Sequence, residues 1–327
     1  MEKVLVTGVT GYIGQHCAAE LLRGGYDVVG TVRSRAKADA TRAALSRVAP
    51  IDRLSFAEAD LLSDGGWADA LQGCSYVLHI ASPFVLAEPR DEHELIGPAV
   101  EGTTRVIAAA QRAGVKRLVL TSSTFAIIAG KPTGEYGPAD WSDPDAEIGA
   151  YAKSKTLAER AAWQAAARGQ MELTVINPGA VFGPSLGAQM DGQSVAMMTK
   201  MIQGKIPLIP DMALGMVDVR DVAMLHVAAM TARGAAGARF IACTAQPIEM
   251  ATVAEVLRAA GYTKAPSRKA PTVLLKVMSR FDREAKGMVP FLGRKATLDI
   301  SATLNVLRWK PTPMADAFRA MAAALAP

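Results

Sequence analysis

A glycine-rich turn near the start of the chain, Gly8–Gly14, does most to limit the fold that this sequence can adopt. It follows a short apolar run, Lys3–Thr7, which suits a buried parallel strand. After it, apolar residues recur at helical spacing from Gly11 to Arg23 and stop at two glycines. The turn is therefore predicted to join the first strand of the chain to its first helix.

The same alternation of strand and helix continues along the first half of the chain. Further strands are predicted at Asp27–Arg33, Arg53–Glu58, Ser75–Ile80, Lys116–Ser122 and Glu172–Asn177, with alanine-rich helices at Ala99–Ala113 and Tyr151–Arg168. Half of the 327 residues are hydrophobic, so a large core can be filled. This order predicts an α/β fold with a doubly wound parallel sheet of the Rossmann type.

The glycine turn also suits an anion. Gly8, Gly11 and Gly14 permit backbone shapes closed to other residues, and they let the backbone approach a pyrophosphate at the helix N-terminus. The spacing is GxxGxxG rather than the GxGxxG of the ordinary dinucleotide fingerprint. A plain tight turn is the alternative. The strand before the turn and the helix after it favour a nucleotide site.

The end of the second strand indicates which nucleotide would bind. NAD enzymes usually place an acid there for the ribose 2′-hydroxyl, but this chain has Arg33 and Lys37, with no carboxylate before Asp39. Such cations fit the 2′-phosphate of NADP(H), which an acid would repel. A solvated basic loop is the alternative interpretation.

Tyr151 and Lys155 lie one helical turn apart, so they share a helix face. An ammonium there would lower the pKa of the phenol towards working pH. The segment Thr121–Ser123 ends the fifth strand, at the sheet edge where open α/β folds bind ligands. Carbonyl reduction by hydride needs a proton donor and a hydrogen bond to the developing alkoxide. Tyr151 would donate the proton, Lys155 would bind the nicotinamide ribose, and a serine would hold the carbonyl oxygen.

After Pro178 the alternation stops. Residues 183–216 contain several glycines and prolines and six methionines: Met190, Met197, Met198, Met201, Met212 and Met216. We therefore expect an NADP-binding domain at 1–178, to which about 217–244 return. A smaller, interleaved, mixed α/β substrate lobe would consist of 179–216 and 245–327. The methionine-rich stretch could be an adaptable lid over the site or ordinary core.

Composition excludes several other classes of function. The net charge of +5 comes from 36 basic and 31 acidic residues, too mixed to indicate a nucleic-acid partner. The three widely spaced cysteines have no metal or CxxC spacing, so we expect buried, reduced thiols and no metal site. We expect no secretory leader and no membrane span. The predicted protein is cytoplasmic, a monomer or homodimer, and binds a small carbonyl or alcohol substrate.

Several motifs follow one another in an order typical of one family. They are Thr7–Gly14, Thr31–Arg33, Ala59–Leu61, His79–Pro83, Leu120–Ser123, Trp141–Asp143, Tyr151 with Ser154–Trp163, and Asn177–Pro184. In these the chain resembles an extended short-chain dehydrogenase/reductase, in the dihydroflavonol-reductase-like branch that also contains cinnamoyl-CoA, methylglyoxal and other carbonyl reductases. The resemblance implies that Ser123 is the catalytic serine. Ser122 could take its place if the strand ends one residue earlier.

Together, the turn and the resemblance predict which residues surround the ligands. The predicted cofactor contacts are Gly8, Thr10, Gly11, Tyr12, Ile13, Gly14, Arg33, Lys37, Asp60, Leu61, Ala81, Ser82, Pro83, Thr121, Tyr151, Lys155, Pro178, Gly179 and Val181. Phe84 and Phe182 flank the expected substrate end of the site. We predict that they form its walls beside Ser123.

Positions at which the sequence differs from its family reduce the range of possible substrates. Flavonoid reductases that resemble this chain carry an asparagine five residues after the serine, where Ile128 stands here. The Lys-Asn-Trp-Tyr signature of cinnamoyl-CoA reductases is also missing. We therefore predict reversible, NADPH-dependent reduction of an apolar or aromatic aldehyde or ketone. One alternative is an NAD-dependent nucleotide-sugar epimerase, which Arg33 disfavours. Another is a non-catalytic NADP-sensing protein, which the tyrosine–lysine pair disfavours.

Overall fold

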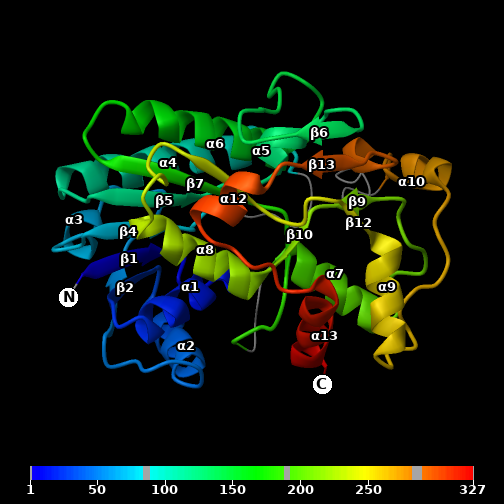
Figure 1. The fold of residues 1–327 in the computed structure, drawn as a ribbon, viewed down its shortest axis with the longest axis horizontal. Coiled ribbons are helices and arrows are strands. Elements are labelled where there is room, and N and C mark those ends of the chain that lie inside the picture. The colour runs from blue at the N-terminus through cyan, green and yellow to red at the C-terminus, as the bar shows by residue number, and fades with distance from the viewer. Residues whose placement is uncertain (1, 84–88, 188–191, 282–288, 327) are drawn as a thin grey trace.

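A single parallel sheet organises the computed structural model, which describes residues 2–83, 89–187, 192–281 and 289–326 (Figure 1). Its seven strands run in the order β11-β7-β5-β4-β1-β2-β3, with every neighbouring pair parallel. They are β1 Lys3–Thr7, β2 Asp27–Val32, β3 Leu54–Glu58, β4 Tyr76–His79, β5 Arg117–Thr121, β7 Glu172–Pro178 and β11 Arg239–Ala242. The predicted doubly wound sheet is confirmed, and all six predicted strands are present within one residue at each end.

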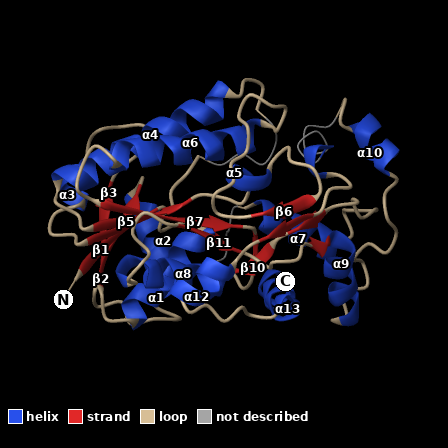
Figure 2. Cartoon of the chain, turned by 45° about the horizontal axis from the view of Figure 1, so that its top comes forward, coloured by secondary structure: helices blue, strands red, loops and turns tan. Residues whose placement is uncertain are grey.

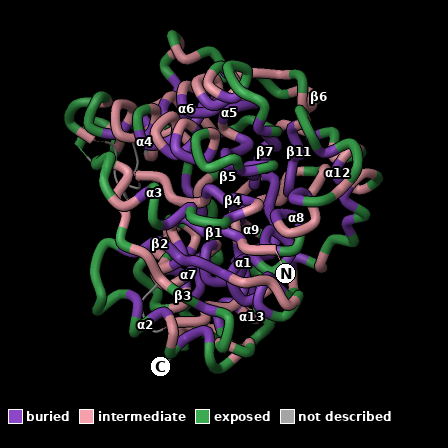
Figure 3. Tube along the Cα trace, turned by 90° about the vertical axis from the view of Figure 1, so that its left-hand side faces the viewer, coloured by how far each residue is buried: buried purple, intermediate pink, exposed green. Residues whose placement is uncertain are grey.

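Helices cover both faces of this sheet (Figure 2). One face carries α1 Tyr12–Arg23, α2 Arg35–Leu45, α8 Val219–Thr231 and α12 Ser301–Val306, and the other carries α3 Trp67–Ala70, α4 His93–Arg112 and α6 Ala150–Ala166. The central strands lie deep in the molecule and are buried on both sides, as Figure 3 shows for β4, β5 and β7. This double burial explains why the strands are continuous apolar runs rather than alternating patterns.

Helix α4 is longer than predicted. It begins at His93, six residues before the expected start at Ala99, and it includes Pro98. A proline inside a helix removes one backbone hydrogen bond and usually marks an end. Here α4 packs along α6 with buried residues such as Leu95 before the proline and Ala99 after it. Tertiary packing therefore stabilises the continuous helix despite the hydrogen bond that Pro98 removes.

The remaining elements build a second layer of small sheets beyond the carboxyl edge of β7 (Figure 1). Strand β8 Ala180–Phe182 pairs with β10 Met216–Asp218, β9 Ala213–Leu214 with β12 Ile248–Glu249, and β6 Gly134–Tyr136 with β13 Ala296–Leu298. The helices there are α5 Phe125–Ile128, α7 Gln193–Ile202, α9 Met250–Ala259, α10 Thr272–Met278, η1 Val289–Phe291 and α13 Met314–Leu325.

Methionines fill much of the core of this second part. Met198, Met201 and Met216 are buried together with Phe182 and residues of α13. Met197 and Met212 pack partly buried against them, and Met190 lies outside the described residues. The five described methionines of residues 183–216 thus pack in or against the core. This favours the interpretation of the stretch as ordinary core over its interpretation as a lid.

Two pairings link distant parts of the chain. Strand β11 returns residues 239–242 to the main sheet beside β7, and β13 pairs with β6, although Ala296 lies far along the chain from its partner Gly134. All three cysteines are free and buried, as expected. In the described part of the chain, no helix has both the length and the hydrophobicity needed to cross a bilayer.

Candidate active site

The glycine turn has the close packing that a phosphate-binding turn requires. Gly8 adopts φ +67°, and a Cβ there would lie 2.9 Å from the backbone of Ala81. A Cβ on Gly14 would lie only 2.1 Å from the Gly8 carbonyl oxygen. Gly11 precedes α1 without a capping side chain, so the first N–H groups of the helix stay open to an anion. The turn fits a dinucleotide pyrophosphate.

A buried hydrogen-bond cluster fixes the strand end next to the turn. The Thr7 hydroxyl oxygen accepts from the backbone N–H groups of Ile80 and Ala81, both at 3.0 Å, and lies 2.8 Å from Nδ1 of His79. Since its lone pairs are taken, the hydroxyl donates to Nδ1, so the imidazole carries its hydrogen on Nε2. Burial lowers the pKa of His79 to about 3 and keeps the ring neutral. Its Nε2 has no partner among the described residues.

The structure brings the predicted catalytic residues together. Ser123 and Tyr151 interact through their side chains, and Ser123 acts to lower the pKa of the Tyr151 hydroxyl. The Nζ atom of Lys155 lies 5.8 Å from the centroid of the Tyr151 ring. Ser123 Oγ also accepts from the backbone N–H of Phe125 at 3.1 Å, which fixes its rotamer. Two hydroxyl groups and one ammonium therefore meet at the carboxyl end of β5.

The expected lowering of the tyrosine pKa is wrong for this structure. Burial raises the pKa of Tyr151 to about 12, and the hydrogen bond with Ser123 opposes this only in part. Burial also lowers the pKa of Lys155 to about 8, against the attraction of Glu159. Loss of solvation is the largest cause at both groups, and neither residue contributes to the pKa shift of the other.

The two residues before Ser123, which are Ser122 and the last residue of β5, Thr121, point to other partners. Ser122 donates to the carboxylate of Glu159 at 2.5 Å, so its hydroxyl is already engaged and does not meet Tyr151. The Thr121 hydroxyl lies 2.7 Å from Nε2 of His226 on the opposite face of the sheet. Alternate strand residues face opposite ways, which explains this division. The Thr121 hydroxyl is therefore engaged within the protein, and the cofactor contact of Thr121 stays a prediction.

Sequence reasoning missed a buried charge network directly beneath the site. The Glu159 side chain is fully buried and accepts from Arg239 Nε at 2.6 Å and from Asn177 Nδ2 at 2.8 Å. Asn177 Nδ2 also donates to the Ser123 carbonyl oxygen at 3.1 Å. The position of Glu159, one helical turn after Lys155, was a usable signal. Nothing local indicated Arg239, which lies 80 residues further on.

The cations predicted to select NADP lie on the surface at the start of α2. Arg33 and Lys37 are both exposed, and no residue within the described ranges forms an ion pair with either. Asp60 accepts from the backbone N–H of Leu62 at 2.9 Å, which fixes the loop after β3. Free guanidinium and ammonium groups at this edge suit a phosphate.

Most of the other predicted cofactor residues lie at the carboxyl ends of the same strands. Ala81, Ser82 and Pro83 follow β4, and Leu61 follows β3; all four are partly exposed. Thr10 and Ile13 are partly exposed within the turn and α1. Pro178 ends β7 and is buried, while Gly179 and Val181 beyond it are partly exposed. Parallel strands place these ends along one edge, as the prediction required.

Three predicted contacts need correction or fall outside the structure. The Tyr12 hydroxyl donates to the Gly183 carbonyl oxygen at 2.7 Å, so only the backbone of Tyr12 remains available to a cofactor. Phe182 is fully buried, with its ring edge-on to Phe318 at 5.0 Å, so it is a core residue and not a wall of the site. Its partners lie on α13, far away in sequence. Phe84 lies outside the described residues.

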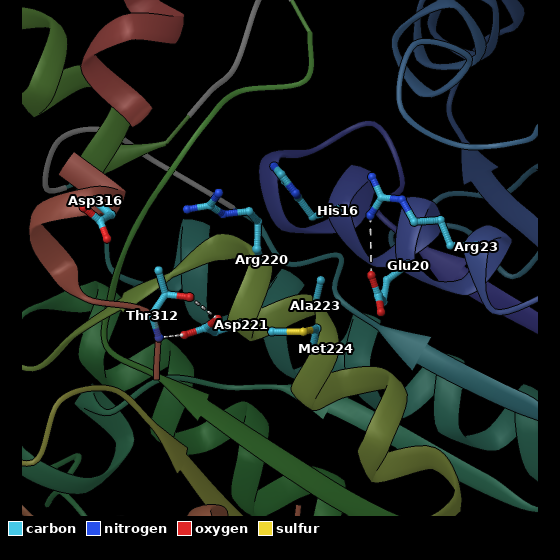
Figure 4. Close-up of a pocket in the computed structure, with 9 residues that line it drawn as sticks. All are labelled: His16, Glu20, Arg23, Arg220, Asp221, Ala223, Met224, Thr312 and Asp316. Carbon is cyan, nitrogen blue, oxygen red and sulfur yellow. Dashed lines mark hydrogen bonds and ion pairs between the residues drawn. The ribbon is translucent and has the colours of Figure 1, made fainter. Parts of the chain in front are cut away.

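A separate depression of about 440 Å³ lies between α1, α8 and the start of α13 (Figure 4). Several of the lining charges are engaged within the protein: Arg23 pairs with Glu20 at 3.4 Å, and Asp221 accepts from the backbone N–H and the hydroxyl of Thr312. None of the predicted catalytic residues lines it. The described residues also contain no group of three side chains that could hold a metal ion.

Comparison with known proteins places these features in context. Residues 4–242 match the NAD dependent epimerase/dehydratase family. Dihydroflavonol 4-reductase of Hordeum vulgare is 37% identical over 57% of this chain, and the match spans only 55% of that protein. A cinnamoyl-CoA reductase of Medicago truncatula is 35% identical over 72% of this chain and 74% of its own length.

A solved structure is similar over nearly the whole chain. Yeast methylglyoxal/isovaleraldehyde reductase, complexed with NADPH, superposes with a TM-score of 0.81 and 25% identity. The match covers 99% of this chain and 98% of that one. The resemblance to extended short-chain reductases drawn from the motifs is thereby confirmed.

Proposed function

Because the chain belongs to the NAD dependent epimerase/dehydratase family, we propose that it is an NADPH-dependent reductase of apolar or aromatic aldehydes and ketones. The reaction is reversible and yields the alcohol. The observation that carries the proposal is the meeting of three side chains: Ser123 interacts with the Tyr151 hydroxyl, and Lys155, one helical turn further along, lies over the Tyr151 ring. Reductases with similar sequences and a similar fold support the same reaction class.

The chain's own residues would supply the proton and the electrostatics. Bound NADPH provides the hydride that reaches the carbonyl carbon. With a pKa of about 12, Tyr151 is protonated at neutral pH and donates its proton as charge develops on the carbonyl oxygen. Ser123, already bonded to Tyr151, donates to the same oxygen. The Lys155 ammonium stabilises the tyrosinate that remains.

The parts of the chain divide this work. We propose that residues 1–178, with about 217–244, bind the cofactor, while 179–216 and 245–327 hold the substrate. The cofactor would be NADP(H), held by the turn at Gly8–Gly14, by Arg33 and Lys37, and by Lys155. The unpartnered Nε2–H of His79 is a further donor next to this set. The NADPH in the similar yeast structure supports this choice of cofactor.

Arg33→Asp should weaken NADPH binding about 10- to 100-fold, because an acid repels the 2′-phosphate and removes a charge-assisted hydrogen bond. NADH affinity should stay the same or rise, because a carboxylate can accept from the ribose 2′-hydroxyl. Fluorescence titration of both nucleotides measures the two affinities. Arg47→Asp is the matched control, since Arg47 is exposed just beyond the opposite end of α2. Unchanged NADPH binding in Arg33→Asp would remove Arg33 from the site.

The value of kcat/KM for NADPH should fall above about pH 8, where the cofactor-free enzyme loses the charge on Lys155. A lysine whose pKa is lowered by burial loses its proton as the pH rises through that value. Tyr151 titrates only near 12 and cannot cause this descent. Initial rates from about pH 6 to about pH 10 measure the profile. Lys155→Met should have a low kcat/KM that does not change with pH through this range. If its kcat/KM still falls above about pH 8, the assignment of this descent to Lys155 is contradicted.

A carbonyl panel tests the proposed function as a whole. NADPH and NADH oxidation, followed by absorbance in parallel, should show turnover of apolar or aryl aldehydes and ketones with a preference for NADPH. Protein that purifies with bound NAD and oxidises no NADPH would instead indicate the epimerase. Tight NADPH binding without turnover on any carbonyl would indicate a sensing protein.

A further inference from the structure

Two phenylalanine rings stand beside the hydroxyl pair. Phe125, the first residue of α5, meets the Tyr151 ring edge to face, with centroids 6.1 Å apart at 85°. Phe291, from η1, stacks on Phe125 with centroids 4.4 Å apart and planes only 16° from parallel. All three rings are partly exposed. The C-terminal part of the chain thus reaches the immediate surroundings of Tyr151.

Apolar residues support these rings. Phe125 and Phe291 pack against buried Ala129, Ile148 and Ala152, in a cluster separate from the main cores. Because Ala152 follows Tyr151 directly in α6, the cluster continues to the base of the tyrosine. Apolar surface of this kind favours contact with an apolar substituent.

The hydroxyl pair fixes where a substrate must lie. A carbonyl bond is only about 1.2 Å long, so an oxygen bonded to Ser123 and Tyr151 holds its carbon close to both. Because the Phe125 ring contacts the Tyr151 ring, it lies within reach of a substituent on that carbon. Aromatic rings attract other rings in edge-to-face or offset-stacked arrangements.

We propose that Phe125 and Phe291 form the wall that receives the substituent of the carbonyl carbon, and that they select aryl or bulky alkyl groups. This inference rests on the proposed reductase function and names the substrate class of the same site. Phe125 contacts the substrate from the catalytic segment, and Phe291 holds that ring in place and extends its surface. Phe291 is therefore a specificity-determining residue contributed by the C-terminal part of the chain.

Two aldehydes test the wall: phenylacetaldehyde carries a phenyl group where propanal carries a methyl group. Phe291→Ala should lower kcat/KM for phenylacetaldehyde about 10- to 100-fold, mainly through KM, and that for propanal by less than about threefold. Phe291→Leu keeps apolar bulk, so its kcat/KM for phenylacetaldehyde should lie between the wild-type value and that of Phe291→Ala. Phe125→Leu should act in the same direction. When Phe125→Leu and Phe291→Ala are combined, kcat/KM for phenylacetaldehyde should fall by less than the product of the two single fold-losses, because the two rings stack on each other.

Phe281→Ala is the matched control, because it makes the same change in the same part of the chain at a ring that is 89% exposed. It should leave both aldehydes unaffected. An equal loss for both aldehydes in Phe291→Ala, or the same discrimination in Phe281→Ala, would overturn the proposed wall.

A binding measurement separates this inference from the reductase assignment. 2-Phenylethanol, added with NADP⁺, should raise the Tm of the wild-type protein and not that of Phe291→Ala. If no aldehyde is reduced but this difference in Tm is present, the reductase function fails while the aryl-binding wall stands. If both proteins respond to 2-phenylethanol equally, the wall is wrong whatever the turnover shows.

Discussion

Tyr151→Phe should lower kcat for carbonyl reduction about 10²- to 10⁴-fold, the usual contribution of a positioned general acid. Only the hydroxyl is removed, so the ring should keep its edge-to-face contact with Phe125 and the variant should fold like the wild type. NADPH binding should change by less than about threefold, because Lys155 and the glycine turn remain. Single-turnover absorbance measures the chemical step, and fluorescence titration measures the cofactor affinity.

The matched control for this variant is Tyr136→Phe, which also removes one phenolic hydroxyl. That hydroxyl donates to the Pro132 carbonyl oxygen in an exposed turn, away from Ser123. Its loss should leave kcat unchanged. Turnover of Tyr151→Phe at the wild-type rate would show that another group supplies the proton, and the assignment of Tyr151 would be abandoned.

Arg239→Met should cost about 3–5 kcal/mol in the free energy of unfolding, because it leaves the carboxylate of Glu159 buried without its counter-charge. Arg239 also donates to the carbonyl oxygens of Pro138 and Asp140 and lies 3.9 Å over the Trp141 ring, so several segments lose their common partner. Urea denaturation at neutral pH measures the loss as a shift of the midpoint at constant m.

Arg53→Met is the matched control, since Arg53 pairs with Asp27 on the surface, where both side chains are more than two-fifths exposed. It should cost no more than about 1 kcal/mol. Replacing Glu159 by leucine together with Arg239→Met should recover much of the stability, because no buried charge remains. Equal losses for Arg239→Met and Arg53→Met would show that the buried pair contributes nothing special.

The double variant also separates stability from activity. Glu159 holds Ser122 and Asn177, and Asn177 in turn holds the carbonyl of Ser123. An apolar replacement cannot bind these groups, so the restored fold should still reduce carbonyls more slowly than the wild type. Glu159 is thus a positioning residue for the catalytic segment as well as half of an ion pair.

The sheet could be predicted well because its signals are local. Most strands from β1 to β7 in the main sheet contain a short apolar run, and burial on both faces makes such runs continuous; the edge strand β3 is the partly exposed exception. Strand β11, Arg239–Ala242, lies in the part of the chain after Pro178, where the regular alternation of strand and helix stops, so no strand was predicted there. Its place beside β7 depends on parallel pairing with residues more than 60 positions earlier.

The site was predictable where chemistry requires residue types at fixed spacing. Ser123, Tyr151 and Lys155 come together because a strand end and a helix start bring them there. The pKa of Tyr151 was mispredicted because burial depends on the whole fold and not on the spacing to Lys155. Phe182 was misassigned for the same kind of reason, since α13 covers it.

The buried pair of Glu159 and Arg239 has a consequence for protein engineering. A chimaera made by joining residues 1–178 to the remainder of a different reductase would import a foreign side chain at position 239. Unless that side chain is also a cation, Ser122, Asn177 and the carboxylate would rearrange, and the transplanted catalytic hydroxyls would lose their alignment. Recombination between relatives should therefore keep 239–242 together with the first 178 residues, whatever lies between them.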